Sequence, residues 1–445
     1  MRLKSKKNKY RAAFILLIFL ALLYFLLKGA LPQYSGRIPL LGMFLIVEYL
    51  VFNFIRDVKP AFNEKFKNIL IFLWWLPVIL LILFLVIAAL IPIIEWKKVW
   101  LVYLPGVGIM ALMAKSVLFI LLIPALLMDV FRRIFHRRIR SSGYYLYIVR
   151  FLKRMAILIG SLAFVSLVIG SIHWVSKFKT REVNIKIENL PETMNGLRIV
   201  QLSDIHLGSW VTTKPLERAV EIVNELKPDL VLFTGDMVNF SAKETNGFET
   251  VLSKIRAPYG VYAIMGNHDY GDYISWPDSI AKAEDLKKLE AFYRTLGWRL
   301  LRNEHTLINI KGGTILLAGV ENWSATARFH RYGNMNITMQ NAPDSDVSIL
   351  MSHDPTHWDA EVTKKYKRFD LTLSGHTHGM QMGFEGFGIK WSPSQYVYKN
   401  WGGLYKVTPT GGKTMNLYVN LGLGHIAYPG RVGMLPEITL LTLTD

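Results

Sequence analysis

Hydrophobic positions follow two different patterns along this sequence. Within residues 1–175 they form long apolar runs, whereas within residues 176–445 they form short β-branched runs that alternate with amphipathic segments. A helix needs roughly 18–20 mostly apolar residues to cross the hydrocarbon core of a bilayer. The first pattern therefore predicts an N-terminal all-α membrane region, and the second predicts a C-terminal α/β domain.

The membrane region is expected to contain about five helices. The first apolar run is slightly short and the second contains Glu48, so counts of four or six helices are alternatives. A basic segment precedes the first run, as in a signal peptide, but no small-residue cleavage pattern follows Leu27, and we expect a retained helix. The five runs are residues 12–27, 38–55, 69–94, 99–128 and 155–175.

Two charged residues, Glu48 and Lys115, lie within the predicted spans. Intramembrane charges usually face the interior of a helix bundle and often mark a transport pathway. The membrane region shows no other transport motif and no repeat between its spans. We therefore favour the interpretation that these two side chains snorkel or pair with each other to support assembly.

Basic residues are concentrated in the membrane region. Residues 1–175 hold 23 Lys and Arg against 5 acidic residues, while residues 176–445 hold 29 against 28. A nucleic-acid-binding protein needs its basic charge on the domain that binds. The second domain is near neutral, so we expect a membrane surface as the partner of the basic residues and no nucleic acid.

The distribution of Lys and Arg between loops predicts the orientation of the spans. The N-terminal tail and the loops at 56–68 and 129–154 together hold 18 basic residues, and the alternate loops at 28–37 and 95–98 hold 4. The positive-inside rule places the first set in the cytoplasm. With five spans, we expect a multi-pass protein of the cell membrane whose second domain is extracytoplasmic.

Strand-length apolar runs alternate with helical patterns in the second domain. Strands alternating with helices, followed by a strand-rich end, favour a layered α/β sandwich with mixed sheets. Helices are expected at about 213–226, 280–296 and 357–366. Strands are expected at 197–202, 230–233, 261–265, 306–310, 314–317, 347–351, 371–373, 417–420 and 438–443.

Candidate metal ligands directly follow five of these strands. The carboxyl ends of strands in an open α/β sheet gather functional groups, so we expect the five segments to converge. Carboxylate, amide and imidazole ligands without sulfur suit Mn, Fe or Zn, and predict a metal-dependent hydrolase. The segments are Asp204-Ile205-His206, Gly235-Asp236, Gly266-Asn267-His268-Asp269, Ser352-His353-Asp354 and Gly375-His376-Thr377-His378-Gly379.

These residue types suit phosphoester hydrolysis by two metal ions. Two ions about 3.5–4 Å apart can clamp a phosphoryl group and ionise a bridging water, and the resulting hydroxide attacks phosphorus. Asp236 follows a glycine and is suited to bridging both ions, while Asn267 offers an amide oxygen. His268 is then available to contact the substrate, and Asp269 is expected to orient the His268 imidazole.

In their order and spacing, the motifs resemble those of the calcineurin-like metallophosphoesterase superfamily over about residues 195–445. Bacterial phosphoesterases and multi-span transmembrane metallophosphoesterases are the most similar members. The resemblance implies a four-layer α/β/β/α sandwich of mixed sheets, and it implies that His268 contacts phosphate and stabilises or protonates the leaving group. It also implies two metal sites, the first made by Asp204, His206, Asp236 and His378 and the second by Asp236, Asn267, His353 and His376.

Two positions depart from the family pattern. Met380 replaces a second glycine after the Gly-His-Thr-His-Gly motif, and Leu421 stands where this subgroup often has Arg. Neither position is a ligand, so metal binding is not affected. The second departure concerns the grip on phosphate, and Arg431 is a candidate substitute.

An aromatic segment at 384–405 follows the last motif. One interpretation is a rim that touches the lipid interface or an acyl chain. The other is a surface loop held by its own aromatic packing, and the sequence does not separate the two.

Three classes of function follow from these patterns. The expected one is a membrane-anchored dinuclear-metal phosphoesterase acting on a phosphoester, with a phospholipid or an envelope-precursor lipid as a candidate substrate. A nucleotide or nucleic-acid phosphodiesterase is disfavoured by the near-neutral second domain. A membrane receptor or transporter with a vestigial domain is disfavoured because no ligand of the motif set is missing.

Overall fold

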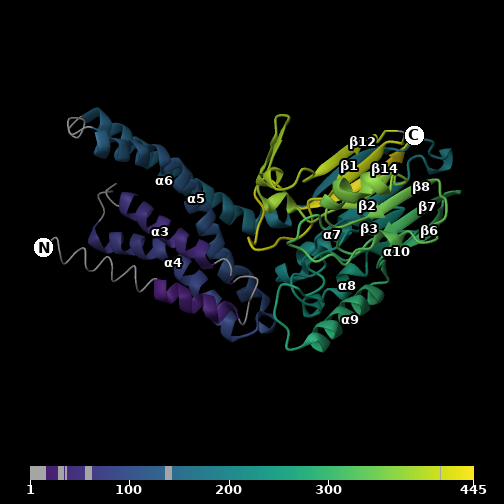
Figure 1. The fold of residues 1–445 in the computed structure, drawn as a ribbon, viewed down its shortest axis with the longest axis horizontal. Helices are drawn as coiled ribbons and strands as arrows, with labels where there is room; N and C mark the ends of the chain where they lie inside the picture. Colours follow the sequence, from purple (N-terminus) through teal and green to yellow (C-terminus); the bar gives the residue numbers. More distant parts are fainter. Residues whose placement is uncertain (1–16, 29–34, 36–37, 56–62, 136–142, 411) are drawn as a thin grey trace. The chain divides into compact units, whose positions relative to one another are not determined.

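The computed structural model describes residues 17–28, 35, 38–135, 143–410 and 412–445 of the 445-residue chain, except for 56–62 (Figure 1). The chain divides into two compact units, Met1–Ile169 and Gly170–Asp445. The first is helical and the second is built on two β-sheets.

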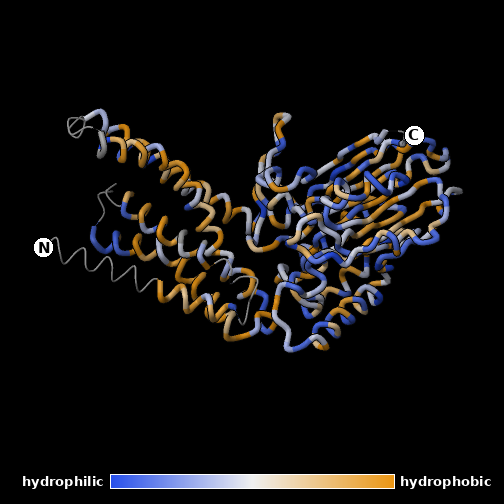
Figure 2. The backbone as a smooth tube through the Cα atoms, viewed as in Figure 1, coloured by the Kyte–Doolittle hydropathy of each residue, from blue (hydrophilic) through white to orange (hydrophobic). Residues whose placement is uncertain are grey.

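The N-terminal unit consists of apolar helices. Within the described residues, three helices are long and apolar enough to cross a membrane, namely Glu64–Leu90, Lys98–Arg132 and Gly143–Ser176, and Leu17–Lys28 and Leu45–Ile55 are shorter. The hydrophobic residues along these helices are orange in Figure 2. The start of the first expected span, residues 12–16, lies outside the described residues. The helices are α3 (Ile38–Ile55), α4 (Glu64–Leu90), η1 (Ile93–Glu95), α5 (Lys98–Phe135) and α6 (Gly143–Ile172).

The two charged residues of the predicted spans contact each other. Lys115 of α5 forms an ion pair with Glu48 of α3 and donates a hydrogen bond of 2.6 Å to the Trp74 carbonyl of α4. Glu48 is only 3% exposed. The expected pairing of these residues is therefore confirmed, and it joins three helices.

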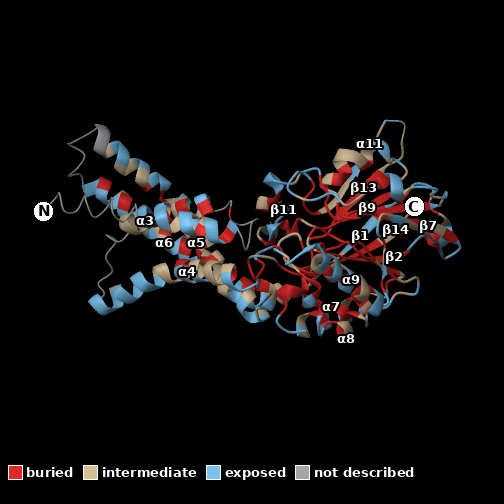
Figure 3. Ribbon diagram, turned by 60° about the horizontal axis from the view of Figure 1, so that its bottom comes forward, coloured by how far each residue is buried: buried red, intermediate tan, exposed pale blue. Residues whose placement is uncertain are grey.

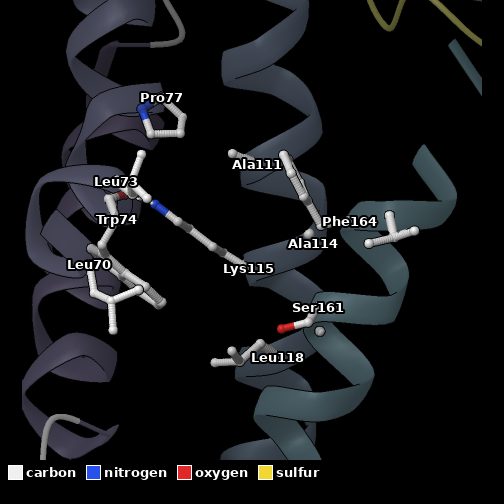
Figure 4. A pocket seen from close by; sticks show the side chains of 12 residues that line it. Leu70, Leu73, Trp74, Pro77, Ala111, Ala114, Lys115, Leu118, Ser161 and Phe164 are labelled. Carbon is white, nitrogen blue, oxygen red and sulfur yellow. Dashed lines mark hydrogen bonds between the residues drawn. The ribbon is translucent and has the colours of Figure 1, made fainter. Parts of the chain in front are cut away.

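A cavity of about 330 Å³ lies beside this ion pair, between α4, α5 and α6. Figure 4 shows Lys115 extending from α5 toward α4 within it. The other side chains around the cavity are almost all apolar, and Ser161 is an exception.

Replacing Lys115 alone should destabilise the helical unit. The Lys115→Met variant leaves the buried Glu48 carboxylate without its cation, and breaking such a pair costs about 3 kcal/mol of unfolding free energy. We expect the double variant Glu48→Gln/Lys115→Met to recover most of this loss, because no buried charge remains. Thermal unfolding of both proteins in the same detergent measures the difference, and equal melting temperatures for the two would contradict it.

The C-terminal unit contains two six-stranded mixed sheets. In the first, β14 runs antiparallel to β2, and the other neighbouring strands are parallel. Its order is β1 (Lys179–Lys186), β14 (Glu437–Thr444), β2 (Arg198–Leu202), β3 (Leu230–Phe233), β4 (Val261–Ala263) and β5 (Arg299–Leu300). The second has the order β12 (Gly403–Val407), β13 (Met415–Val419), β9 (Leu371–Ser374), β8 (Val347–Met351), β7 (Gly313–Gly319) and β6 (Glu304–Ile310).

Three hydrophobic cores place these sheets between two layers of helices. One core lies between the sheets and contains Ile199 of β2 and Ile349 of β8. A second packs α7 (Lys214–Glu225), α8 (Glu249–Leu252) and α9 (Ser279–Thr295) on the first sheet. A third includes α10 (Met335–Thr338) and the π-helix η7 (Trp358–Val362) on the second sheet. The strands are accordingly the most buried part of the unit (Figure 3), and the expected four-layer α/β/β/α sandwich is confirmed.

The sequence expectation omits several elements of the structure, among them β1, β5 and β12, and one expected helix is irregular. The helix expected at 357–366 begins as the π-helix η7 and ends as the short α11 (Thr363–Lys365). Strand β1 was not expected at all, because its sequence KTREVNIK has no apolar run. It lies at the edge of the first sheet, where one face and one edge remain accessible, so polar side chains are tolerated.

Candidate metal centre

The five motif segments converge at the carboxyl ends of β2, β3, β4, β8 and β9. Two clusters of ligand atoms result, and within each cluster the atoms lie within 4.8 Å of one another. The backbone N–H of His376 donates to both oxygens of Asp204 at 3.1 Å, which connects the end of β9 with that of β2. The clusters are Asp204, His206 and His378, and Asp236, His353 and His376. Six of the seven predicted ligands are thereby brought together.

Asp236 lies between the two clusters. Its Oδ2 is 3.7 Å from His206 Nε2, which belongs to the first cluster, and 3.0 Å from His353 Nε2, which belongs to its own. In the first cluster, His378 Nε2 is 3.0 Å from His206 Nε2 and 3.2 Å from Asp204 Oδ1. Ring nitrogens that face each other and a carboxylate in this way can share one cation. Asp236 is placed to serve two such positions.

The carboxylates of this centre are buried and need compensating positive charge. The Asp204 and Asp236 carboxylates are 0% and 1% exposed, and buried charges are costly unless they are compensated. Burial lowers the pKa of His206 and of His376, which leaves both imidazoles neutral. Burial also acts to lower the pKa of His353, but the Asp236 carboxylate outweighs it and raises that pKa to about 10. Metal ligands must be deprotonated, so a divalent cation would take the place of the proton held between His353 and Asp236, and the donor set fits such cations.

Asn267, the seventh predicted ligand, has a side-chain oxygen without a hydrogen-bond partner. Its Nδ2 donates a hydrogen bond of 2.7 Å to the Tyr273 hydroxyl. Its Oδ1 is buried and has no hydrogen-bond partner among the described residues. A buried acceptor without a partner is costly in a native protein unless something outside the chain satisfies it. The orientation imposed by Tyr273 therefore leaves Asn267 Oδ1 available to a metal ion.

Most of the candidate ligands have a backbone conformation that non-glycine residues rarely adopt. Five of the seven have positive φ angles near the left-handed region, which non-glycine residues usually avoid. Such strain persists where the surrounding structure enforces it, and it clusters at functional sites. The angles are 51° at Asp204, 49° at His206, 60° at Asp236, 70° at His376 and 51° at His378.

One glycine allows the motif loops to approach each other this closely. A Cβ atom on Gly375 would lie 1.9 Å from the Ser203 hydroxyl oxygen and 2.3 Å from Asp204 Oδ2. Any side chain at this position would therefore push the end of β9 away from the end of β2. The glycine that precedes His376 in the sequence motif is explained by this packing.

Backbone carbonyls orient the imidazoles. His206 Nδ1 lies 3.2 Å from the Val238 carbonyl and His353 Nδ1 lies 2.8 Å from the Thr234 carbonyl, so Nε2 of each ring faces the centre. His376 is reversed. Its Nε2 lies 3.1 Å from the Tyr398 hydroxyl and 3.6 Å from Asp354 Oδ2, which leaves Nδ1 for the centre. The sequence pattern placed Asp354 in a motif segment and Tyr398 in the aromatic segment, but only the fold brings them and Tyr273 to these rings.

His268 occupies the more accessible side of the centre. Its Nδ1 lies 2.8 Å from the Asn239 carbonyl, and its ring stacks on Tyr273 at 4.2 Å and meets His206 edge-on at 5.0 Å. It is partly exposed, whereas His206 and His353 are fully buried. The remaining ring nitrogen, Nε2, is the atom that can meet a substrate.

Asp269 does not orient His268, and that part of the sequence prediction is wrong. Its Oδ1 accepts hydrogen bonds from the backbone N–H groups of Met237 and Val238, and its Oδ2 accepts from those of Asp236 and Gly266. Burial and the charge of Asp236 raise the pKa of Asp269 to about 7, against the effect of these donors. Asp269 therefore fixes the loop that carries Asp236.

Replacing Asp269 with asparagine should loosen this loop. The side-chain oxygen of asparagine can accept hydrogen bonds from only some of the four backbone N–H groups. Its NH2 group, which is itself a donor, would face the others. We expect a loss of about 2–3 kcal/mol of unfolding free energy, the scale of a buried hydrogen bond to a charged group that is left unmade. Denaturant unfolding measures the loss, and Asp285→Asn, another buried carboxylate, serves as the comparison. An unchanged midpoint for Asp269→Asn would show that the loop does not need the charge.

Arg431 cannot replace the missing substrate arginine. Its side chain is 0% exposed, and its guanidinium donates to the carbonyls of Gly422 and Gly424. One of its nitrogens also lies 3.2 Å from His378 Nδ1. The suggestion that Arg431 grips phosphate is therefore wrong, because the side chain is enclosed behind a candidate ligand.

Comparison with known proteins identifies the family of this domain. A family model described as "Calcineurin-like phosphoesterase" matches residues 197–380. The metallophosphoesterase YkuE of Bacillus subtilis is 32% identical over 60% of this chain and 85% of its own length. A zebrafish transmembrane protein with metallophosphoesterase domain is 31% identical over 62% of this chain and 60% of its own length.

Among solved structures, TT1561 of Thermus thermophilus matches 51% of this chain and 90% of its own chain, with 14% identity and a TM-score of 0.33. The sequence matches above are what establish the family. They agree with the motif order, with the sandwich fold and with the two clusters of ligand residues. The chain therefore belongs to the calcineurin-like phosphoesterase family, as a metal-dependent phosphoric ester hydrolase carried by a membrane protein.

Proposed function

We propose that this protein hydrolyses the phosphoester of a lipid at a centre built for two divalent ions, of Mn, Fe or Zn. The observation that carries the proposal is the position of Asp236 between two buried clusters of Asp and His side chains. In the proposed assignment, Asp204, His206, Asp236 and His378 hold one ion, and Asp236, Asn267, His353 and His376 hold the other. Two such ions polarise a phosphoryl group and supply a hydroxide nucleophile at neutral pH.

The side chains of the centre would bind and orient the reacting groups. His268 Nε2 faces the accessible side and would hydrogen-bond a phosphoryl oxygen or give a proton to the leaving oxygen. The Asn239 carbonyl and the Tyr273 ring hold the His268 imidazole in place. Asp269 would act as a positioning residue, because it fixes the backbone of Asp236 and not the substrate.

The near-neutral charge of the domain and its attachment to a membrane region support a lipid substrate. Residues 176–445 hold 29 basic and 28 acidic residues, so the domain has almost no net charge to attract a polyanion. An anchor also keeps the centre beside amphipathic molecules. Nucleotides and nucleic acids are therefore the disfavoured alternatives.

A substrate screen on the full chain tests this proposal. The reconstituted protein would be given phospholipids, an envelope-type lipid pyrophosphate, nucleotides and single-stranded DNA, with a generic aryl phosphodiester and monoester as references. We expect turnover of a lipid above that of every nucleotide. Turnover of nucleotides alone would overturn the lipid assignment, and no turnover of either aryl ester by protein with its metals bound would overturn catalysis.

We also propose that the protein is a multi-pass protein with five spans and an extracytoplasmic catalytic domain. The support is the loop bias of 18 against 4 basic residues. A reporter that is active only outside the cytoplasm should give signal when it is fused after Asp445. Signal from a cytoplasm-active reporter alone would reverse the topology, and would direct the substrate search to cytoplasmic phosphoesters.

A further inference from the structure

Exposed hydrophobic side chains of the catalytic unit are concentrated in one short segment. Among the described residues after 172, eleven large hydrophobic side chains are exposed, and six of them lie within residues 384–397. Of the other five, Met380 lies just before this segment, and those at 211, 280, 307 and 337 are scattered along the chain. Clustered exposed apolar groups mark interaction sites, whereas single ones are ordinary. The six are Phe384, Phe387, Ile389, Trp391, Tyr396 and Val397.

The centre of this cluster is a β-hairpin, which we call the aromatic hairpin and define as residues 384–391. It consists of β10 (Phe384–Gly386) and β11 (Ile389–Trp391), which form a separate two-stranded sheet and project from the domain (Figure 1). The other two exposed residues, Tyr396 and Val397, follow directly after it. The hairpin thus presents its apolar side chains away from the three hydrophobic cores.

The tip of the hairpin carries Phe387, a residue type that favours neither this turn nor solubility. Gly386 pairs with Ile389, so Phe387 and Gly388 form a two-residue turn with φ angles of 52° and 76°. Turns with positive φ at both positions favour Asn-Gly or Gly-Gly. Phe387 is instead a bulky aromatic residue in a strained conformation, and it is 99% exposed. Strain of this kind points to a function of the side chain itself.

Both charged residues of the hairpin, Glu385 and Lys390, contact other parts of the domain. Glu385 accepts hydrogen bonds from Arg181 at 2.5 and 2.8 Å and from Lys179 at 3.0 Å. Lys390 Nζ donates to the Gly402 carbonyl at 2.9 Å and lies over the Trp401 ring. These contacts fasten the hairpin at its base and leave an apolar tip. A protein partner recognised through salt bridges would find little to pair with there.

The hairpin is fastened to the part of the domain that directly follows the membrane helices. The last apolar helix runs to Ser176, and β1 begins three residues later at Lys179. Lys179 and Arg181 of β1 are the residues that bind Glu385. The strand that binds the hairpin is therefore joined to the end of an apolar helix by a very short stretch of chain.

We propose that the aromatic hairpin is a membrane-docking element that places Phe387 and its neighbours in the interface of the bilayer in which the same chain is anchored. Aromatic side chains favour the boundary between lipid headgroups and hydrocarbon. The segment continues to Tyr398, whose hydroxyl lies 3.1 Å from His376 Nε2. Docking would therefore hold the metal centre at the lipid surface, whether or not the substrate is a lipid.

The sequence contains no cysteine, so a single introduced one can be labelled without competition. A nitroxide spin label would be attached to Phe387→Cys in the full chain, reconstituted with one chain per phosphatidylcholine nanodisc. Accessibility to oxygen reports insertion into lipid, and accessibility to a water-soluble nickel chelate reports exposure to water. The control is Ile280→Cys, because Ile280 is exposed at 68% on α9 of the same domain. A label at Phe384→Cys gives a second probe of the hairpin.

We expect the labels at 387 and 384 to be several-fold less accessible to the nickel chelate, and more accessible to oxygen, than the label at 280. Equal accessibility at 387 and 280 would overturn the proposal. A label that is protected only when several chains share one disc would overturn it as well, because a second copy of the protein would then be the partner. Thermal unfolding of each variant verifies the fold. The measurement requires no turnover, so its result is separate from that of the substrate screen.

Discussion

The Asp236→Ala variant should lose both metal ions and its catalytic activity together. Asp236 Oδ2 lies 3.0 Å from His353 and 3.7 Å from His206, and in our assignment its carboxylate is the ligand that the two sites share. Metal ions contribute several kcal/mol to stabilisation of a phosphoryl transition state, so we expect kcat to fall by about 10³-fold or more. Elemental analysis of the purified protein measures the metal, and hydrolysis of an aryl phosphodiester measures the rate.

Asp370→Asn is a suitable control for this variant. Asp370 is also a buried carboxylate, but it precedes β9 at the opposite end of that strand and pairs with Lys413. It should affect stability without changing the metal content. If Asp236→Ala kept two equivalents of metal, Asp236 would not be the bridging ligand.

The His268→Ala variant should separate metal binding from turnover. His268 Nδ1 is engaged by the Asn239 carbonyl, and its Nε2 is directed to the accessible side of the centre. A side chain that contacts the phosphoryl or leaving oxygen contributes about 10²–10⁴-fold as an acid or base. We expect kcat to fall by this amount while both metal ions are retained.

His305→Ala provides the matched comparison, because His305 is a partly buried histidine of β6 that contacts the Thr338 carbonyl. It should leave both the metal content and kcat close to those of the parent protein. Loss of metal from His268→Ala would instead place His268 among the ligands. The pair of variants therefore tests the division of the centre into metal-binding and substrate-binding residues.

The sequence by itself determined the candidate ligands and the class of the fold. Metal-ligand residue types follow five apolar strands, and the parallel strands within each sheet bring their carboxyl ends to one edge. The packing of the two sheets against each other then brings those two edges together. For Glu48 and Lys115 the sequence left snorkelling and pairing open, and the structure shows the pair.

Only the tertiary structure decided which groups surround the candidate ligands. Asp269 follows His268 directly in the sequence, yet its carboxylate turns to backbone N–H groups, because a buried anion takes the donors that the loop of Asp236 presents. Arg431 is enclosed beside His378, and Tyr273 directs the amide of Asn267. These contacts join residues from separate loops, and a sequence pattern carries no record of side-chain direction.

The edge of the first sheet and the aromatic hairpin were also decided by the fold. Strand β1 lacks an apolar run, and its pairing with β14 comes from backbone hydrogen bonds that any sequence can make. The aromatic residues at 384–397 were visible in the sequence, but packing and exposure were equally compatible with them. In the fold the cores are filled by other side chains, which leaves Phe387 almost completely exposed.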